Sequence, residues 1–182
     1  MLLQLVANHP EAIFTILRKT PVWVWGLLAG FLALGISQLR DRTASVARVS
    51  ILPVAMTIFS LSGAFSALGG SPHLASAIAA WLIAAAVAFA VLAPGRADAQ
   101  FDPVRRSFRL PGSVVPLLLI VGIFLVKYVV GVELAMAPRL VQDTQYALVV
   151  AALYGAFTGV FVGRASRLWR LALRPAAAGI AA

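Results

Sequence analysis

The sequence predicts an all-α membrane protein, a polytopic bundle of about five transmembrane helices with amphipathic interfacial helices at both termini. Residues of the type AVILMFWYC make up 62% of the 182 residues and charged residues only 12%, which is too apolar for a soluble domain of this size. The apolar residues fall into five blocks, each near the roughly 20 residues that a helix needs to cross a bilayer. The roughly ten-residue alternation of a membrane β-barrel is missing from the sequence, so helices are the expected spanning elements.

We divide the chain into three parts: an outer-face interfacial segment at 1–20, a transmembrane domain at 21–163 and a basic cytoplasmic segment at 164–182. Proline and glycine mark the boundaries of the spans, since Pro21 suits a first helical turn and the stretches Gly69-Gly-Ser-Pro72 and Ala93-Pro-Gly95 are turn signals. The predicted spans are residues 21–39, 49–68, 74–93, 113–136 and 145–163.

Both terminal segments have the pattern of helices that lie on the membrane surface. From about Pro10 to Lys19 we expect a short amphipathic helix, with Trp23 and Trp25 marking the outer end of the first span. Near the other terminus, arginines recur every three or four residues with apolar residues between them, which predicts a basic amphipathic helix on the cytoplasmic surface. The lipid-facing residues expected in the first helix are Ile13, Phe14, Ile16 and Leu17, and the arginines of the second are Arg164, Arg167, Arg170 and Arg174.

The positions of the cations predict an orientation. Clusters of arginine follow the first, third and fifth spans, whereas the other side carries only Arg18, Lys19 and Arg139. By the positive-inside rule the clusters face the cytoplasm, so the N-terminus is outside and the C-terminus inside the inner membrane. The clustered cations are Arg40, Arg42, Arg48, Arg96, Arg105, Arg106, Arg109, Arg164, Arg167, Arg170 and Arg174.

Composition excludes several classes of function. The net charge of +9 arises from short clusters next to the spans, without interleaved aromatic residues, so we expect contact with the bilayer and its anionic lipid headgroups and no nucleic acid. There is no cysteine, and therefore no disulfide and no cysteine-based metal site. His9 and His73 lie outside the spans and in no ligand-spaced motif, so we predict no metal and no cofactor.

Small residues spaced four apart form a stripe on the fifth span. This GxxxG-like spacing lets another backbone approach closely, within the chain or in a homodimer, and a narrow glycine-lined pore is a third reading. The stripe comprises Ala147, Ala151, Gly155, Gly159 and Gly163, and the first span repeats the spacing at Gly26 and Gly30.

Lys127 is the one cation inside a predicted span. An ammonium near the bilayer centre costs roughly 2.5–3.5 kcal/mol on insertion scales. Either its stem snorkels to the interface, or it faces the interior and binds an anion or a proton, or it forms a structural buried pair. Counting residues along neighbouring spans places Ser60, Ser62 and Tyr154 at a similar depth, and these are our candidate ligand-binding residues with Lys127.

We infer an integral inner-membrane protein that binds a small molecule or ion, or moves it across the membrane, around Lys127. The alternative is a non-catalytic accessory or assembly protein that acts through helix–helix contacts with a membrane-protein partner. An enzyme ranks third, since the sequence has no nucleophile–base pair and no metal constellation.

Two stretches also resemble a known family. They are Thr20-Pro-Val-Trp-Val-Trp-Gly26 with Gln38-Leu-Arg-Asp-Arg42, and Arg109-Leu-Pro-Gly-Ser113 with Pro116, Ile123-Phe124 and Lys127-Tyr128. This pattern is similar to that of a family of small bacterial inner-membrane proteins of unknown function. The resemblance implies a bacterial inner-membrane setting and supplies no active site.

Overall fold

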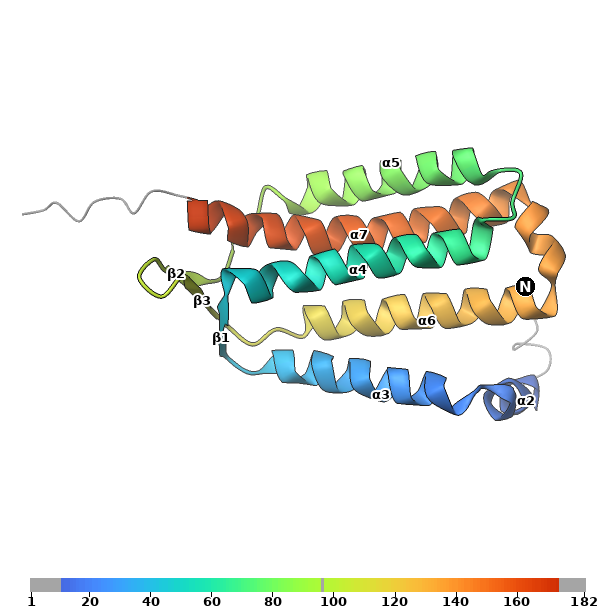
Figure 1. The fold of residues 1–182 in the computed structure, drawn as a ribbon, viewed down its shortest axis with the longest axis horizontal. Coiled ribbons are helices and arrows are strands. Elements are labelled where there is room, and N and C mark those ends of the chain that lie inside the picture. Colours follow the sequence, from blue (N-terminus) through green and yellow to red (C-terminus); the bar gives the residue numbers. More distant parts are fainter. Residues whose placement is uncertain (1–10, 96, 174–182) are drawn as a thin grey trace, which may run out of the picture.

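The computed structural model describes residues 11–95 and 97–173, most of which are helical (Figure 1). Five of its helices are long and apolar enough to cross a membrane. In chain order the elements are α2 (Glu11–Lys19), α3 (Val22–Ile36), η1 (Ser37–Leu39), β1 (Arg42–Ser45), α4 (Val46–Leu68), α5 (Leu74–Leu92), β2 (Gln100–Asp102), β3 (Ser107–Leu110), α6 (Val115–Met136), η2 (Pro138–Gln142) and α7 (Thr144–Leu173).

Side-chain caps fix the starts of two of the long helices. Ser45 has an extended backbone, and its hydroxyl accepts a hydrogen bond from the Arg48 amide at 3.3 Å, which caps α4. The Asp143 carboxylate likewise accepts from the Tyr146 amide at 2.8 Å at the start of α7. Each cap satisfies an amide that has no partner within its own helix.

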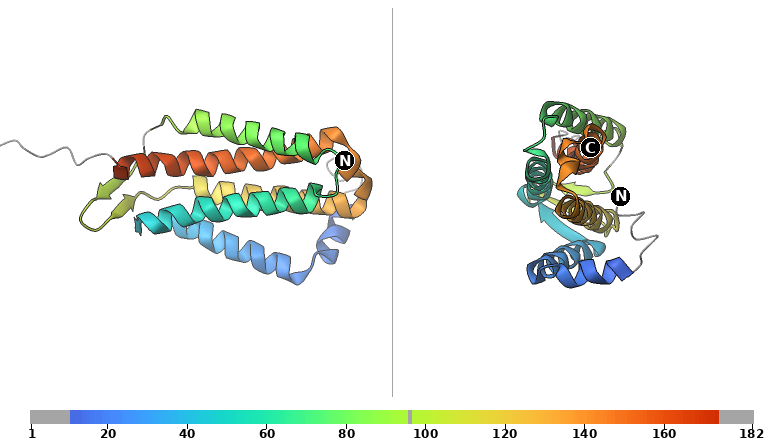
Figure 2. Two further views of the ribbon diagram at one scale, coloured as in Figure 1. Left: turned by 45° about the horizontal axis from the view of Figure 1, so that its top comes forward. Right: turned by 90° about the vertical axis from the view of Figure 1, so that its right-hand side faces the viewer.

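The five long helices fall into two groups. In the first, α4 and α5 both pack on α7, and the α5–α7 contact is the most extensive in the molecule. In the second, α3 packs on α6, which makes much less contact with α4 and α7. The end-on view in Figure 2 places α3 and α5 at opposite ends of the cross-section. We call the boundary between α6 and the α4–α7 pair the seam.

The small-residue stripe of α7 explains the close α5–α7 contact. A Cβ atom added at Gly155 would lie 2.8 Å from the Trp81 carbonyl carbon, and one at Gly159 would lie 2.8 Å from the Ala88 Cβ, both on α5. Gly163 and Ala151 continue the same buried face. Because lipid tails are as apolar as the helix surface, this backbone proximity and its van der Waals contacts hold the pair together.

Gly26 and Gly30 on α3 are placed differently. Nothing lies within 4 Å of a Cβ added at either position, so these two glycines contact no neighbouring helix among the described residues. Gly35, one turn further along, is the buried glycine of α3 and lies against Leu117 of α6.

A three-stranded antiparallel sheet, in the order β1-β3-β2, corrects the all-α prediction. Phe108 of β3 pairs with Ala44 of β1 on one side and with Phe101 of β2 on the other, and its side chain is fully buried. The strands have only three or four residues, too few for a period of two to stand out in a region rich in arginine. The all-α class therefore holds only approximately.

The last helix is also longer than the predicted span. α7 continues without a break to Leu173, so residues 164–173 are one helix with the predicted span at 145–163 and do not form a separate helix. No proline or glycine follows Gly163 before that point to interrupt it. Arg167 donates to the Leu92 carbonyl at the end of α5, and the Trp169 indole nitrogen donates to Ser50 Oγ at 2.9 Å, which ties this extension to α5 and α4.

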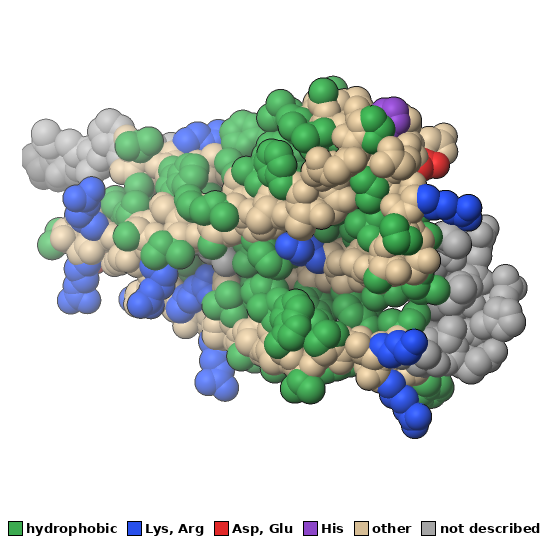
Figure 3. All heavy atoms as spheres, turned by 45° about the vertical axis from the view of Figure 1, so that its right-hand side comes forward, with side chains coloured by type: hydrophobic (Ala, Val, Ile, Leu, Met, Phe, Trp, Pro, Cys, Tyr) green, Lys and Arg blue, Asp and Glu red, His purple; other side chains and the backbone are tan. Residues whose placement is uncertain are grey.

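Cations gather at the two ends of the bundle. Figure 3 shows Lys and Arg side chains mainly towards the ends of one face and apolar side chains over the helices between them. The end with the sheet carries Arg40, Arg42, Arg48, Arg105, Arg106, Arg109, Arg164, Arg167 and Arg170. Arg96, Arg174 and His9 lie outside the described residues.

Candidate functional site

Lys127 lies near the middle of α6 and points into the seam. Its helix rises about 18 Å from Val115 to Lys127 and about 13 Å more to Met136. The Lys127 Nζ lies 3.7 Å from the centroid of the Phe59 ring of α4, a cation–π contact. The side chain is half-buried, so the ammonium is neither fully enclosed nor free in the surrounding medium.

Gly63 makes room for this ammonium. A Cβ atom at Gly63 would lie 3.1 Å from the Lys127 Nζ and 3.3 Å from Cζ of Tyr154, so both groups approach the bare backbone of α4. Tyr154 comes from α7 and is almost fully buried. The ammonium is therefore held where α4, α6 and α7 meet, against the Phe59 ring and the backbone of Gly63.

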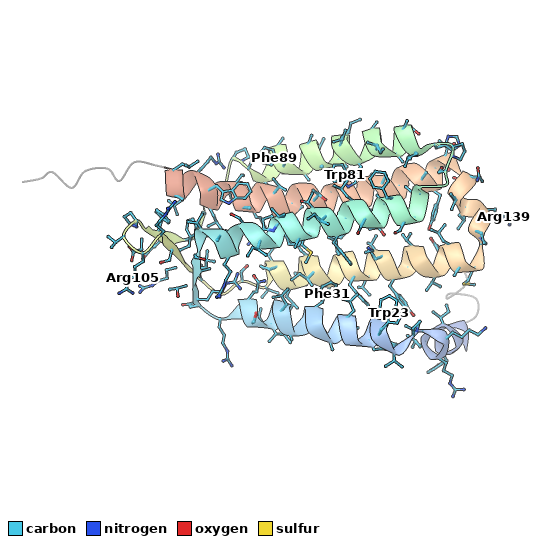
Figure 4. The ribbon with its side chains drawn as sticks, viewed as in Figure 1. Trp23, Phe31, Trp81, Phe89, Arg105 and Arg139 are labelled. Carbon is cyan, nitrogen blue, oxygen red and sulfur yellow. The ribbon has the colours of Figure 1, made fainter. Side chains whose placement is uncertain are left out.

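Ser60 and Tyr154 are joined by a hydrogen-bond network behind Lys127. The Ser60 hydroxyl donates to the Tyr154 carbonyl at 2.9 Å, and the Thr158 hydroxyl donates to the same carbonyl at 3.1 Å. The indole nitrogen of Trp81, on α5, donates to Ser60 Oγ at 3.2 Å. Figure 4 shows Trp81 on α5 facing the bundle. The network links the three helices of the first group and uses the Ser60 hydroxyl as both donor and acceptor.

Ser62 does not join the site. Its side chain is exposed and its hydroxyl donates to the Phe59 carbonyl of its own helix at 2.9 Å. Two residues along an α-helix correspond to a rotation of about 200°, so Ser60 and Ser62 face nearly opposite directions. Of the four predicted ligand-binding residues, Tyr154 lies with Lys127 beside Gly63, and Ser60 is joined to the Tyr154 carbonyl.

An aromatic group borders the ammonium on the α3 side. The Phe31 ring of α3 meets Phe59 edge-on at 5.8 Å and Phe124 of α6 edge-on at 6.3 Å (Figure 4). Phe124 in turn stacks with Tyr128 at 6.2 Å, and the Tyr128 hydroxyl is 2.7 Å from Oγ1 of Thr20. These contacts connect the site to the start of α3.

On the sheet side of the ammonium, apolar packing fills the seam. Met56, Ile120, Ile123 and Phe161 form a buried cluster there, and Phe157 lies against Gly122. The charged part of the seam is therefore confined to the level of Lys127, with a tightly packed stretch next to it.

Phe59, Gly63, Trp81 and Thr158 were not predicted as site residues. Trp81 carried a usable signal, because tryptophan in membrane helices is enriched at interfaces and this one lies in mid-span. Thr158 lies one helical turn after Tyr154, which is the spacing at which a threonine hydroxyl can donate to a carbonyl of its own helix. For Phe59 and Gly63 the sequence offers no signal, since it does not say which face of α4 meets α6.

The described residues contain no group of three or more His, Cys, Asp or Glu side chains that could hold a metal ion. His73 Nε2 lies 3.0 Å from the Thr144 hydroxyl, a contact that joins the α4–α5 loop to the start of α7. An apolar groove of about 200 Å³ runs between α4 and α5 over Ala151, and it does not reach Lys127.

Comparison with known proteins gives one match. No curated protein and no solved structure matches the chain. A model described as "Family of unknown function (DUF6622)" matches residues 1–179, nearly the entire chain. The chain therefore belongs to this family of unknown function.

Proposed function

We propose that this protein spans the bilayer five times and binds a small anionic molecule in the seam, with the Lys127 ammonium as the counter-charge. The observation that carries the proposal is an ammonium near the middle of α6 that lies against an aromatic ring and bare glycine backbone. An ammonium in this position is costly, and an anion would offset part of that cost. Attraction between the two charges is also stronger there than in water.

The seam offers a route for the ligand. The contact between α6 and the α4–α7 pair is less extensive than the contacts within either group of helices, so the two groups would separate there at the lowest cost in packing. The cluster of Met56, Ile120, Ile123 and Phe161 would have to open in that separation. Movement of the ligand across the membrane would require this separation at both ends of the bundle. We therefore propose ligand binding as the main function and transport of the ligand as a second candidate.

Lys127→Met is expected to abolish anion binding and leave the fold intact, because methionine keeps the length of the stem and removes the charge. The measurement is the ligand-induced thermal shift of wild type and variant with acetate, phosphate and decanoate, using decanol as the uncharged counterpart of decanoate. The matched control is Lys19→Met, which removes the other lysine of the chain, an exposed residue at the end of α2.

Equal shifts in wild type and Lys127→Met, or none in either, would refute the proposal. An increase in the melting temperature of Lys127→Met without any ligand effect would show that the ammonium merely snorkels, because the cost of inserting the charge into the membrane disappears with the charge. The accessory-protein alternative would then lead. The observation that favours it is the face of α3 at Gly26 and Gly30, which no described residue covers and which fits a partner helix or a second copy of this chain.

The proposed orientation in the inner membrane has the N-terminus outside and the arginine-rich end in the cytoplasm. Single cysteines at Gly70, in the α4–α5 loop, and at Gln100, in β2, test it in a chain that has no cysteine of its own. Both positions are exposed and lie at opposite ends of the bundle. In intact cells an impermeant thiol reagent should label Gly70→Cys and spare Gln100→Cys; the reverse labelling would overturn the orientation.

A further inference from the structure

A second candidate site lies at the arginine-rich end of the bundle, far from Lys127. A pocket of about 390 Å³ opens there between the start of α4, the β2–β3 hairpin and the end of α7. Its walls are mainly apolar, with one cationic residue among them. They include Val46 of α4, Phe101, Pro103 and Arg106 of the hairpin, and Trp169 and Leu173 of α7.

The hairpin holds Arg106 in an unusual backbone conformation. Arg106 has φ of 46°, and it is the one residue other than glycine with positive φ in the described chain. Its carbonyl accepts a hydrogen bond from the Val46 amide at 3.3 Å, while the Asp102 carboxylate accepts from the amides of Val104 and Arg105 at 3.0 and 3.1 Å. Glycine or asparagine usually occupies such a position, so the arginine is retained there at some conformational cost.

Positive charge around the pocket is in excess. Asp41 and Asp102 use their carboxylates to accept from backbone amides, and Asp98 acts electrostatically on Arg164. The described residues of this end thus carry three acids and nine arginines. Arg42 bonds to the side-chain oxygen of Gln38 at 2.6 Å, and its pKa is lowered by burial and by the neighbouring Arg48. An anion from outside the chain would relieve the repulsion among these guanidinium groups.

The depth of the pocket matches the headgroup layer of a bilayer. From Thr144 to Trp169, α7 rises about 37 Å, compared with a hydrocarbon core of roughly 30 Å. Trp169, with its indole nitrogen bonded to Ser50, therefore falls just outside the core, where tryptophan is enriched. The anions at this depth are the phosphate groups of lipids.

We propose that this pocket binds the headgroup of an anionic phospholipid, with the Arg106 guanidinium on the phosphate and the apolar walls against the glycerol and the first acyl carbons. The inference rests on the proposed membrane location and is independent of Lys127. A guanidinium suits this role because its planar N–H groups match phosphate oxygens in pairs.

Arg106→Gly is the informative variant, because glycine accepts positive φ without strain and removes only the side chain. Arg105→Ala removes the same charge from the same hairpin at an exposed position that does not line the pocket. The full-length, delipidated protein in detergent is titrated with phosphatidylglycerol, phosphatidylcholine and glycerol 3-phosphate, with thermal shift and native mass spectrometry as readouts.

We expect Arg106→Gly to weaken phosphatidylglycerol binding roughly five-fold or more and Arg105→Ala to change it less than about two-fold, with phosphatidylcholine bound weakly by all three proteins. Arg106→Lys should restore part of the affinity. Equal losses in the two charge-removing variants would show diffuse attraction and overturn the proposal. Binding of glycerol 3-phosphate as tight as that of the lipid would overturn it in favour of a soluble phosphate ligand. None of these outcomes tests the Lys127 proposal, which uses different ligands and different variants.

Discussion

Gly159→Leu is expected to separate α7 from α5 and to destabilise the protein by at least about 3 kcal/mol, the upper part of the range for overpacking. The position has no room for a side chain, since even a Cβ atom would lie 2.8 Å from the Ala88 Cβ and would press on the Ala85 carbonyl. Helix backbone cannot yield as a flexible side chain can, so the whole α5–α7 contact must open. The measurement is the thermal unfolding temperature in detergent.

Gly26→Leu is the matched control, because it places the same side chain on a membrane helix where nothing lies within 4 Å. We expect its unfolding temperature to stay close to that of wild type. If Gly159→Leu left the unfolding temperature unchanged but abolished a cross-linkable dimer, the α7 stripe would be an interface between two copies. Loss of the dimer in Gly26→Leu alone would instead locate the interface on α3.

Gly63→Leu is expected to displace the Lys127 ammonium and to lower the free energy of unfolding by about 1–3 kcal/mol. Like Lys127→Met, it should also abolish anion binding. The new side chain would start 3.1 Å from the Lys127 Nζ and 3.3 Å from Tyr154 Cζ, in the space that the ammonium now occupies. Gly63→Ala should be milder, because the tip of the lysine can shift by a few tenths of an ångström. Unfolding temperature and decanoate-induced thermal shift give the two readouts.

Gly131→Leu serves as its control, one turn beyond Lys127 on α6, with nothing within 4 Å of its Cβ. It should keep both stability and the ligand response. A Gly63→Leu protein that retains the full decanoate shift would show that the ligand does not bind against this part of α4.

The helices could be predicted from the sequence because long apolar blocks are a local property of composition. α5 illustrates this, since its bounds at Leu74–Leu92 almost coincide with the predicted span at 74–93. The sheet could not be predicted in the same way. Its strands are held by pairing between β1 and β3, which are more than 60 residues apart in the chain, and no local pattern records that pairing.

The same limit applies to the candidate site. Lys127 is evident because a charge in an apolar run is rare, and counting residues gives its depth. Counting along α4 shows that Ser60 and Ser62 face different directions, but it does not show which of them faces α7. The glycine pattern has the same weakness: the spacing at Gly26 and Gly30 equals that at Gly155 and Gly159, yet within the described part of the chain only the second pair meets another helix. Which helix faces meet is a tertiary property.

The most direct test of the account is the side-chain ammonium signal of Lys127 itself. The chain has two lysines, Lys19 and Lys127, so ¹⁵N labelling at lysine Nζ gives two signals that Lys19→Met and Lys127→Met assign. In nanodiscs of zwitterionic lipid, titration with decanoate should shift the Lys127 signal saturably and leave that of Lys19 nearly unchanged, whereas decanol should move neither. A Lys127 signal that stays fixed with decanoate, acetate and phosphate alike, or that moves no more than that of Lys19, would contradict the account.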